Sequence, residues 1–227
     1  MDAEPGAVVS LATTPRLLPA IPSAAGQVVL VAAVCATVGA AAMGRRGAAL
    51  AASVATVAMA PYGASVARHR PYTATPAGAW RWFVDSTWSA PNTLAGAVFH
   101  HHQWLRGNRG VPARSTGSGT LWLEQPAIAG YATTVGIVKA GSNDRVDAHE
   151  DVHVLQARLL GPLYLPLVAA HYAVATVFPY WLLRRSGQRP PMRTVRDYLH
   201  EGVYHEVWHE RWAYAVAPTT SRGAGPA

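Results

Sequence analysis

Residues 148–166 read AHEDVHVLQARLLGPLYLP, and this stretch decides how the rest of the chain is interpreted. Its segment HEDVH, residues 149–153, is an H-E-x-x-H pattern in a chain with ten histidines and six glutamates. A random chain of this composition would contain roughly 0.01 such patterns, so chance explains the segment poorly. On a helix, residues four apart share one face, and both imidazoles can therefore reach one metal ion. Glu150 lies between them, where it can act as general base for a metal-activated water. A second pattern, HEVWH, occupies residues 205–209.

The composition favours a membrane protein over a soluble one. Half of the residues are hydrophobic and 14% are charged, whereas about 25% is usual for a soluble domain. The net charge is +7, and the pairs Arg45-Arg46 and Arg184-Arg185 flank apolar runs, which suits an anionic lipid surface. No motif for nucleic-acid binding is present, and we expect no nucleic-acid partner. The single cysteine, Cys35, excludes intramolecular disulfides and cysteine-type zinc sites, so a metal must be held by histidine and carboxylate.

The N-terminal part is predicted to anchor the chain in a membrane. After a lead of residues 1–23, two uncharged apolar runs, 24–43 and 48–66, are separated by the short turn 44–47. The first run is long enough to cross a bilayer, and together the two predict a transmembrane helical hairpin over residues 24–66. The alternative is a buried helix pair in a soluble bundle. We expect an integral membrane protein of the bacterial inner (plasma) membrane, with the lipid bilayer as its partner.

The remainder is predicted to be mainly α, forming a membrane-associated metal domain over residues 67–217, before a disordered tail at 218–227. Two short β-prone runs, Thr120–Gln125 and Tyr131–Lys139, predict a small β-hairpin just before the metal helix. The metal helix is expected to begin near Asp147.

A third apolar stretch, residues 159–183, constrains the geometry. As one straight helix it would carry the first H-E-x-x-H pattern and the final predicted helix, 195–217, to opposite sides of a membrane. Pro162, Pro166 and Pro179 interrupt it, so we expect either a re-entrant or interfacial segment or a kinked span. Either arrangement allows one metal site.

A hydrolytic zinc site needs three protein ligands and an open position for water. His149 and His153 supply two, and the candidates for the third are Glu206, His209 and Glu210. The chain resembles gluzincin metallopeptidases, in which a later E-x-x-A-D helix provides a glutamate ligand. The sequence Glu210-Arg-Trp-Ala matches E-x-x-A, and Tyr214 stands where the acidic residue is usual. The resemblance implies that His149, His153 and Glu210 hold one Zn²⁺ per chain and that Glu150 is catalytic.

The segment from the first histidine to LGPLYLP also resembles bacterial membrane proteins that carry H-E-x-x-H-x-x-Q followed by L-G-P-L-Y-L-P. The earlier DSTWSAPNTLAG, residues 85–96, is similar to the same group, and the likeness covers roughly residues 83–217. It implies a membrane-bound zinc-dependent hydrolase, and in particular a metallopeptidase acting on a peptide or protein. Asp147 or Asp151 is expected to orient a ligand histidine.

The sequence leaves the oxyanion partner and two alternative functions open. A hydrolase needs a group that stabilises the oxyanion, and Tyr204, Tyr214 and His205 are the candidates for this role. A histidine-box membrane oxidase or hydroxylase with two irons would use the clusters 100–102, 149/153 and 205/209. The third possibility is a non-catalytic membrane protein with a decayed metal site.

Overall fold

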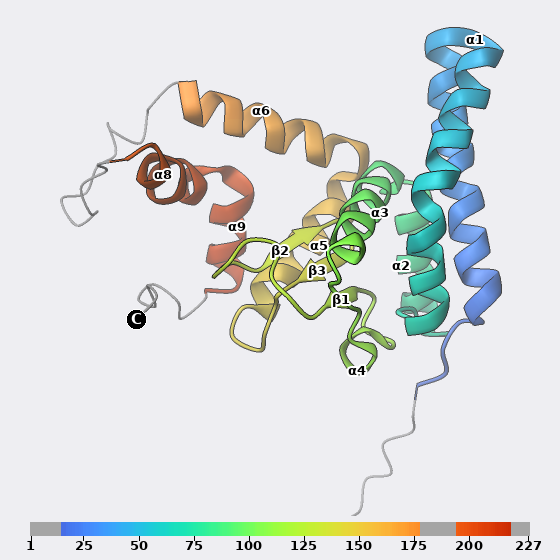
Figure 1. The fold of residues 1–227 in the computed structure, drawn as a ribbon, viewed down its shortest axis with the longest axis horizontal. Coiled ribbons are helices and arrows are strands. Elements are labelled where there is room, and N and C mark those ends of the chain that lie inside the picture. Colours follow the sequence, from blue (N-terminus) through green and yellow to red (C-terminus); the bar gives the residue numbers. More distant parts are fainter. Residues whose placement is uncertain (1–14, 178–193, 219–227) are drawn as a thin grey trace, which may run out of the picture.

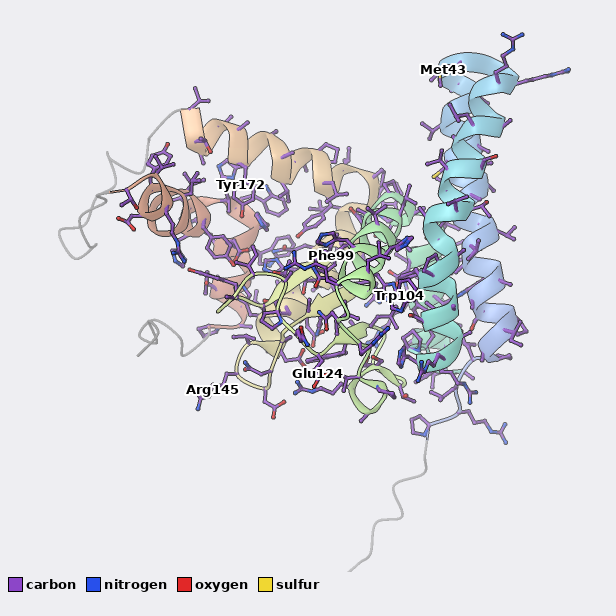
Figure 2. All side chains as sticks on the ribbon, in the orientation of Figure 1. Met43, Phe99, Trp104, Glu124, Arg145 and Tyr172 are labelled. Carbon is purple, nitrogen blue, oxygen red and sulfur yellow. The ribbon has the colours of Figure 1, made fainter. Side chains whose placement is uncertain are left out.

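The computed structural model describes residues 15–177 and 194–218, and these are mainly helical with one small mixed sheet (Figure 1). Helix α1 (Ala20–His69) is two antiparallel helices joined where Met43 and Gly44 leave helical geometry, at the tip of a long hairpin (Figures 1 and 2). The two arms approach closely at Gly39 and Gly47, where neither residue has a side chain. A Cβ on Gly39 would lie only 2.3 Å from the carbonyl oxygen of Gly47. The apolar runs thus form the hairpin geometry expected of them.

Among the described residues, two helical stretches are long and apolar enough to cross a membrane, judged by length and composition alone: α1 and residues 147–177. Many large side chains of α1 are exposed, as on a surface that lipid would cover: Ile21, Val29, Val38, Leu50, Val54 and Val57.

Helices α2 (Pro76–Ser86) and α3 (Ala90–Leu105) pack beside the lower part of the hairpin (Figure 1). Thr75 begins α2 by accepting a hydrogen bond from the backbone N–H of Gly78. A buried polar chain connects the hairpin with this layer: Gln27 donates to the hydroxyl of Tyr72, which donates to Asp85. The guanidinium of Arg158 closes the chain with two hydrogen bonds of 2.9 and 2.8 Å to Asp85. The hairpin is therefore connected by hydrogen bonds to the helix that carries the H-E-x-x-H pattern.

The sheet differs from the predicted hairpin. After the short helix α4 (Pro112–Ser115), its strands are β1 (Leu121–Leu123), β2 (Thr133–Val135) and β3 (Val138–Ala140), in the order β1-β3-β2. The hairpin lies within the second β-prone run, where β2 and β3 pair antiparallel across a two-residue turn. The first run pairs parallel to β3. The pairing of the two runs as one hairpin was therefore wrong, because the second run contains its own turn and can pair with itself.

Helix α5 (Asp147–Leu160) contains the H-E-x-x-H pattern and ends at Gly161. Gly161 has a φ of 52°, and a Cβ there would lie 2.3 Å from the indole ring of Trp88. Ser89 donates to the carbonyl of Ala157, and Asn92 donates to the carbonyl of Gly161, so the end of α5 is capped by side chains. Residues 85–92 (DSTWSAPN) thus contact residues 157–161 at the end of α5 directly.

Beyond a 3₁₀ turn (Gly161–Leu163), α6 (Tyr164–Val177) runs crosswise to the hairpin (Figure 1). Its 14 residues extend about 21 Å, short of the roughly 30 Å apolar core of a bilayer. Residues 178–183 of the third apolar stretch lie outside the described residues, so the choice between a re-entrant segment and a kinked span stays a prediction.

The predicted final helix is broken. It consists of α8 (Val195–Asp197), a π-helical turn (Tyr198–Val203), a 3₁₀ turn (Tyr204–Glu206) and α9 (Trp208–Val216). The break is at Val207, whose backbone is extended with a ψ of 138°. The side chain of Val207 is fully buried and packs with Ala175 of α6. The uninterrupted helix expected over 195–217 was therefore wrong, and the second H-E-x-x-H pattern does not place its two histidines on one helical face.

Candidate metal centre

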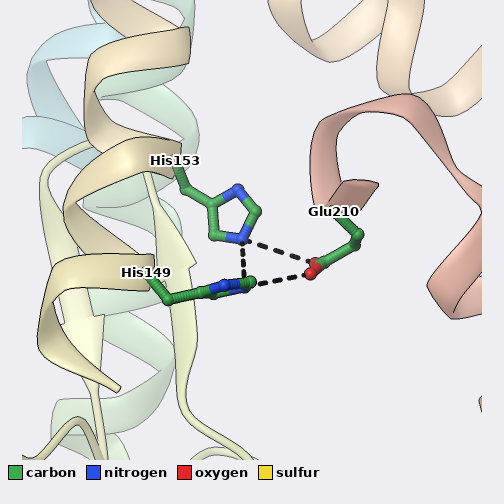
Figure 3. A group of neighbouring side chains, drawn as sticks. All are labelled: His149, His153 and Glu210. Carbon is green, nitrogen blue, oxygen red and sulfur yellow. Dashed lines mark hydrogen bonds and ion pairs between the residues drawn. The ribbon is translucent and has the colours of Figure 1, made fainter. Parts of the chain in front are cut away.

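His149 and His153 of α5 and Glu210 of α9 converge on one point (Figure 3). One possible ligand atom of each lies within 4.8 Å of those of the other two, and all three side chains are buried. The Nε2 atom of His149 is 3.1 Å from Oε2 of Glu210 and 3.2 Å from Nε2 of His153. The Nε2 atom of His153 is 3.5 Å from Oε1 of Glu210. Because α5 and α9 lie side by side, residues 61 positions apart form one group.

The electrostatics keep the carboxylate of this group ionised. Burial alone would raise the pKa of Glu210, but the hydrogen bonds from His149 and His153 outweigh it and hold that pKa far below its usual range. Burial likewise favours neutral His153, yet the hydrogen bond and the charge of Glu210 raise the pKa of His153. Two imidazoles and an ionised carboxylate, buried and convergent, fit the His₂Glu ligand set of a catalytic zinc ion. The group could therefore hold a divalent metal ion.

Gln156, one turn after His153, orients that histidine. It is fully buried, and its Oε1 atom lies 3.1 Å from Nδ1 of His153. With Nδ1 protonated, Nε2 presents its lone pair to the metal site. The amide of Gln156 also donates to the backbone carbonyl of His209, at 2.8 Å, next to Glu210. Gln156 thus connects the two helices of the site. This role was not predicted from the sequence, although Gln156 stands at a fixed spacing, three residues after His153.

The two aspartates expected in this orienting role do something else. Asp147 and Asp151 both pair with Lys139, whose ammonium group is almost completely buried on β3. The Lys139 ammonium group also lies 4.8 Å from the centre of the Trp122 ring. The charge of Asp151 therefore helps to neutralise a buried lysine of the sheet. The proposed orienting role of both aspartates was wrong.

His149 has a different environment from His153. Its Nδ1 atom is buried and has no hydrogen-bond partner among the described residues. The ring of Tyr214 packs against it, with the ring centres 4.4 Å apart. Tyr214 occupies the position where gluzincins usually carry an acidic residue, and here it supplies an aromatic contact in place of a carboxylate acceptor.

Glu150 shares a cavity with the metal-binding group. The cavity has a volume of about 280 Å³, and Glu150, His153 and Glu210 all line it. Thr134 on strand β2 donates a hydrogen bond of 2.5 Å to Oε2 of Glu150. This bond holds one carboxylate oxygen and leaves the other available to a proton.

The remaining candidate ligands lie outside the group of three. Glu206 is buried and reaches Arg211, with 4.0 Å between the charged atoms. His209 lines the cavity, and its Nε2 atom is 3.6 Å from Oε1 of Glu210. Burial lowers the pKa of His209 to about 4, so its imidazole is neutral at pH 7. Of the oxyanion candidates, Tyr204 lines the cavity, whereas His205 and Tyr214 are absent from its lining.

The histidines of the alternative diiron site are not brought together in the described residues. Nε2 of His100 is 2.8 Å from the hydroxyl of Ser65 in the hairpin, and the His100 ring contacts Tyr62. Within the described residues, the group with metal-ligand geometry contains only His149, His153 and Glu210. A two-iron centre built from the three histidine clusters finds no support in this arrangement.

A scan against protein-family models, a search of the curated proteins and a search of the solved structures each returned no match. The likeness to gluzincins therefore rests on the sequence motif and on the geometry of the three side chains. These support a His-His-Glu group that could hold a metal ion, and they do not identify the metal.

Proposed function

We propose that the chain is a membrane-anchored, zinc-dependent hydrolase whose target is a peptide bond. One observation carries the proposal: Glu150 lines the same cavity as His153 and Glu210, two of the three side chains of the metal-binding group. A metal site that serves only stability is closed by four protein ligands, whereas a hydrolytic site has three and an acid-base group next to the open position.

Each residue has a defined task in this reaction. Bound zinc would supply an activated water and polarise the scissile carbonyl. Glu150 takes the proton of the attacking water on its free oxygen and delivers it to the leaving amine. Thr134 fixes the Glu150 carboxylate through its hydrogen bond. Gln156 holds His153 in the tautomer and orientation that a ligand requires.

The choice of a peptide bond is supported by the edge of the sheet. In the strand order β1-β3-β2, strand β2 is at the edge of the sheet and pairs, among the described residues, with β3 alone. Thr133 and Thr134 of this strand line the cavity next to Glu150. An edge strand can pair with the backbone of an extended peptide, so a peptide bound there would place its carbonyl beside the metal group.

The anchor in this proposal is the α1 hairpin. Its arms are long and largely exposed, and outside the tip they carry no charged residue between Ala20 and Val66, which is the surface expected of a segment that lipid surrounds. Helices α5 and α9, which carry the metal-binding group, lie outside the proposed span.

The test is hydrolysis of a fluorogenic peptide library by detergent-purified protein carrying Glu150→Gln. Removing the general base should lower kcat by roughly 10²–10⁴-fold while metal content stays unchanged. The matched control is Glu124→Gln, an exposed glutamate directly after β1, away from the site (Figure 2). Full activity of Glu150→Gln, with the control also active, would refute the assigned role of Glu150.

A further inference from the structure

The cavity beside the metal-binding group has two chemically different halves. Its carboxylate and imidazole side chains are Glu150, His153, His209 and Glu210, and all four belong to or adjoin the metal-binding group. The rest of the lining consists mainly of aromatic and aliphatic side chains from three separate segments: Ile128, Tyr131, Ala132, Tyr164, Tyr172 and Tyr204. Among the described residues that line it, there is no lysine or arginine.

The aromatic half is held in place by contacts between the segments. Tyr164 and Tyr172 come from α6, and their ring centres lie 6.4 and 5.5 Å from that of His209. Tyr204 lies across from Tyr131, with 6.3 Å between the ring centres. These rings come from α6, the 3₁₀ turn before α9 and the loop before β2, so the wall is built by the tertiary fold. Its shape is therefore largely set before a substrate arrives.

The size of the cavity limits what it can hold. At about 280 Å³ it is slightly smaller than the roughly 300–1,000 Å³ of sites that enclose drug-sized ligands. It has room for one large side chain together with the reacting group. A substrate side-chain carboxylate would face Glu150 and Glu210, and no lysine or arginine among the described lining residues would compensate it.

We propose that this cavity selects peptides that place a bulky apolar side chain, aromatic or large aliphatic, next to the scissile bond. The inference rests on the proposed function, since it names the substrate class of that site. Ile128 is the position that tests it most cleanly, because it lines the cavity and yet is 56% exposed. Substitutions there can close or widen the entrance while leaving the core intact.

The first experiment measures binding by saturation-transfer NMR, using ligands without a metal-binding group, on the full-length, detergent-purified chain. N-acetyl-phenylalanine amide should bind, and the aspartate and lysine derivatives should bind at least about tenfold more weakly. Ile128→Trp should weaken binding of the phenylalanine derivative by about tenfold or more. Ile128→Val, the matched control, should leave it unchanged. Equal binding of the three ligands, tighter binding of the lysine derivative, or no effect of Ile128→Trp would overturn the proposal.

The second experiment measures a change of preference. Tyr172→Ala should enlarge the cavity, so that binding of a 2-naphthylalanine derivative improves relative to phenylalanine, whereas Tyr172→Phe should preserve the original order. An unchanged order in a folded Tyr172→Ala protein would contradict the assignment. Selective binding without peptide hydrolysis would refute the proposed hydrolase activity and still support the apolar selectivity of the cavity, so the two failures are distinguishable.

Discussion

Replacing Gln156 by leucine tests how the metal-binding group is held together. The side chain of Gln156 is completely buried, and leucine has a similar size. The substitution removes the acceptor 3.1 Å from Nδ1 of His153 and the donor 2.8 Å from the carbonyl of His209. It therefore frees one ligand imidazole to rotate and breaks the hydrogen bond that connects α5 with the start of α9.

The expected effects follow from these two bonds. Loss of an outer-sphere partner of a ligand histidine typically weakens metal binding by about 10–100-fold. In addition, the Nδ1–H of His153 and the backbone carbonyl of His209 are left without partners in the interior. At about 1–3 kcal/mol for each unsatisfied group, the free energy of unfolding should fall by on the order of 3 kcal/mol.

Two measurements separate these effects: the zinc dissociation constant, by competition with a chromophoric chelator, and thermal unfolding with and without zinc. Gln103→Leu is the matched control, because Gln103 is also buried and accepts a hydrogen bond from Asn108 on another part of the fold. It should lower stability and leave zinc affinity unchanged. If Gln156→Leu bound zinc as tightly as the unsubstituted protein, the orienting role of Gln156 would be refuted.

Three other perturbations give independent checks. Arg158→Met leaves the buried Asp85 without its positively charged partner and should lower the free energy of unfolding, measured by chemical denaturation, by about 3–5 kcal/mol. Adding Asp85→Asn should recover part of this loss, and strictly additive losses would contradict the coupling. Gly161→Ala places a Cβ against the Trp88 ring at a positive φ and should cost more than about 1 kcal/mol; unchanged stability would show that the α5 end is placed wrongly. Because the pKa of His153 is raised above 6.5 and metal ligands must be deprotonated, zinc affinity should fall with decreasing pH through that raised pKa. The stability of the metal-free protein should show the opposite trend. The stabilisation from protonated His153 is complete below its unfolded-state pKa and is lost as pH rises through its folded-state pKa. A pH-independent zinc affinity would argue against His153 as a ligand.

Local patterns in the sequence were sufficient for part of this arrangement. The i, i+4 spacing of His149 and His153 needs only helical geometry, and α5 forms where the motif predicts a helix. The two apolar runs around Gly44 likewise predicted a helical hairpin, because the length of each run and the turn between them can be read from the local sequence. Glu210 could be ranked above its neighbours only through the resemblance to gluzincins, because its approach to α5 depends on the tertiary fold.

The features that the sequence did not reveal depend on contacts between distant segments. The break at Val207 follows from burial of this side chain against α6, which outweighs the helical periodicity of residues 195–217. Asp151 resembled a possible partner of a ligand histidine because its pairing with the buried Lys139 of β3 could not be foreseen. The pairing of β1 with β3 requires a parallel register that no local turn signal encodes.

The most direct test of the account is the metal content of the detergent-purified protein, measured by plasma mass spectrometry beside two variants. We expect about one zinc per chain, lost in Glu210→Ala and retained in Glu206→Gln, because the Glu206 carboxylate lies outside the metal-binding group. Two irons per chain, no metal, or zinc retained in Glu210→Ala would contradict it.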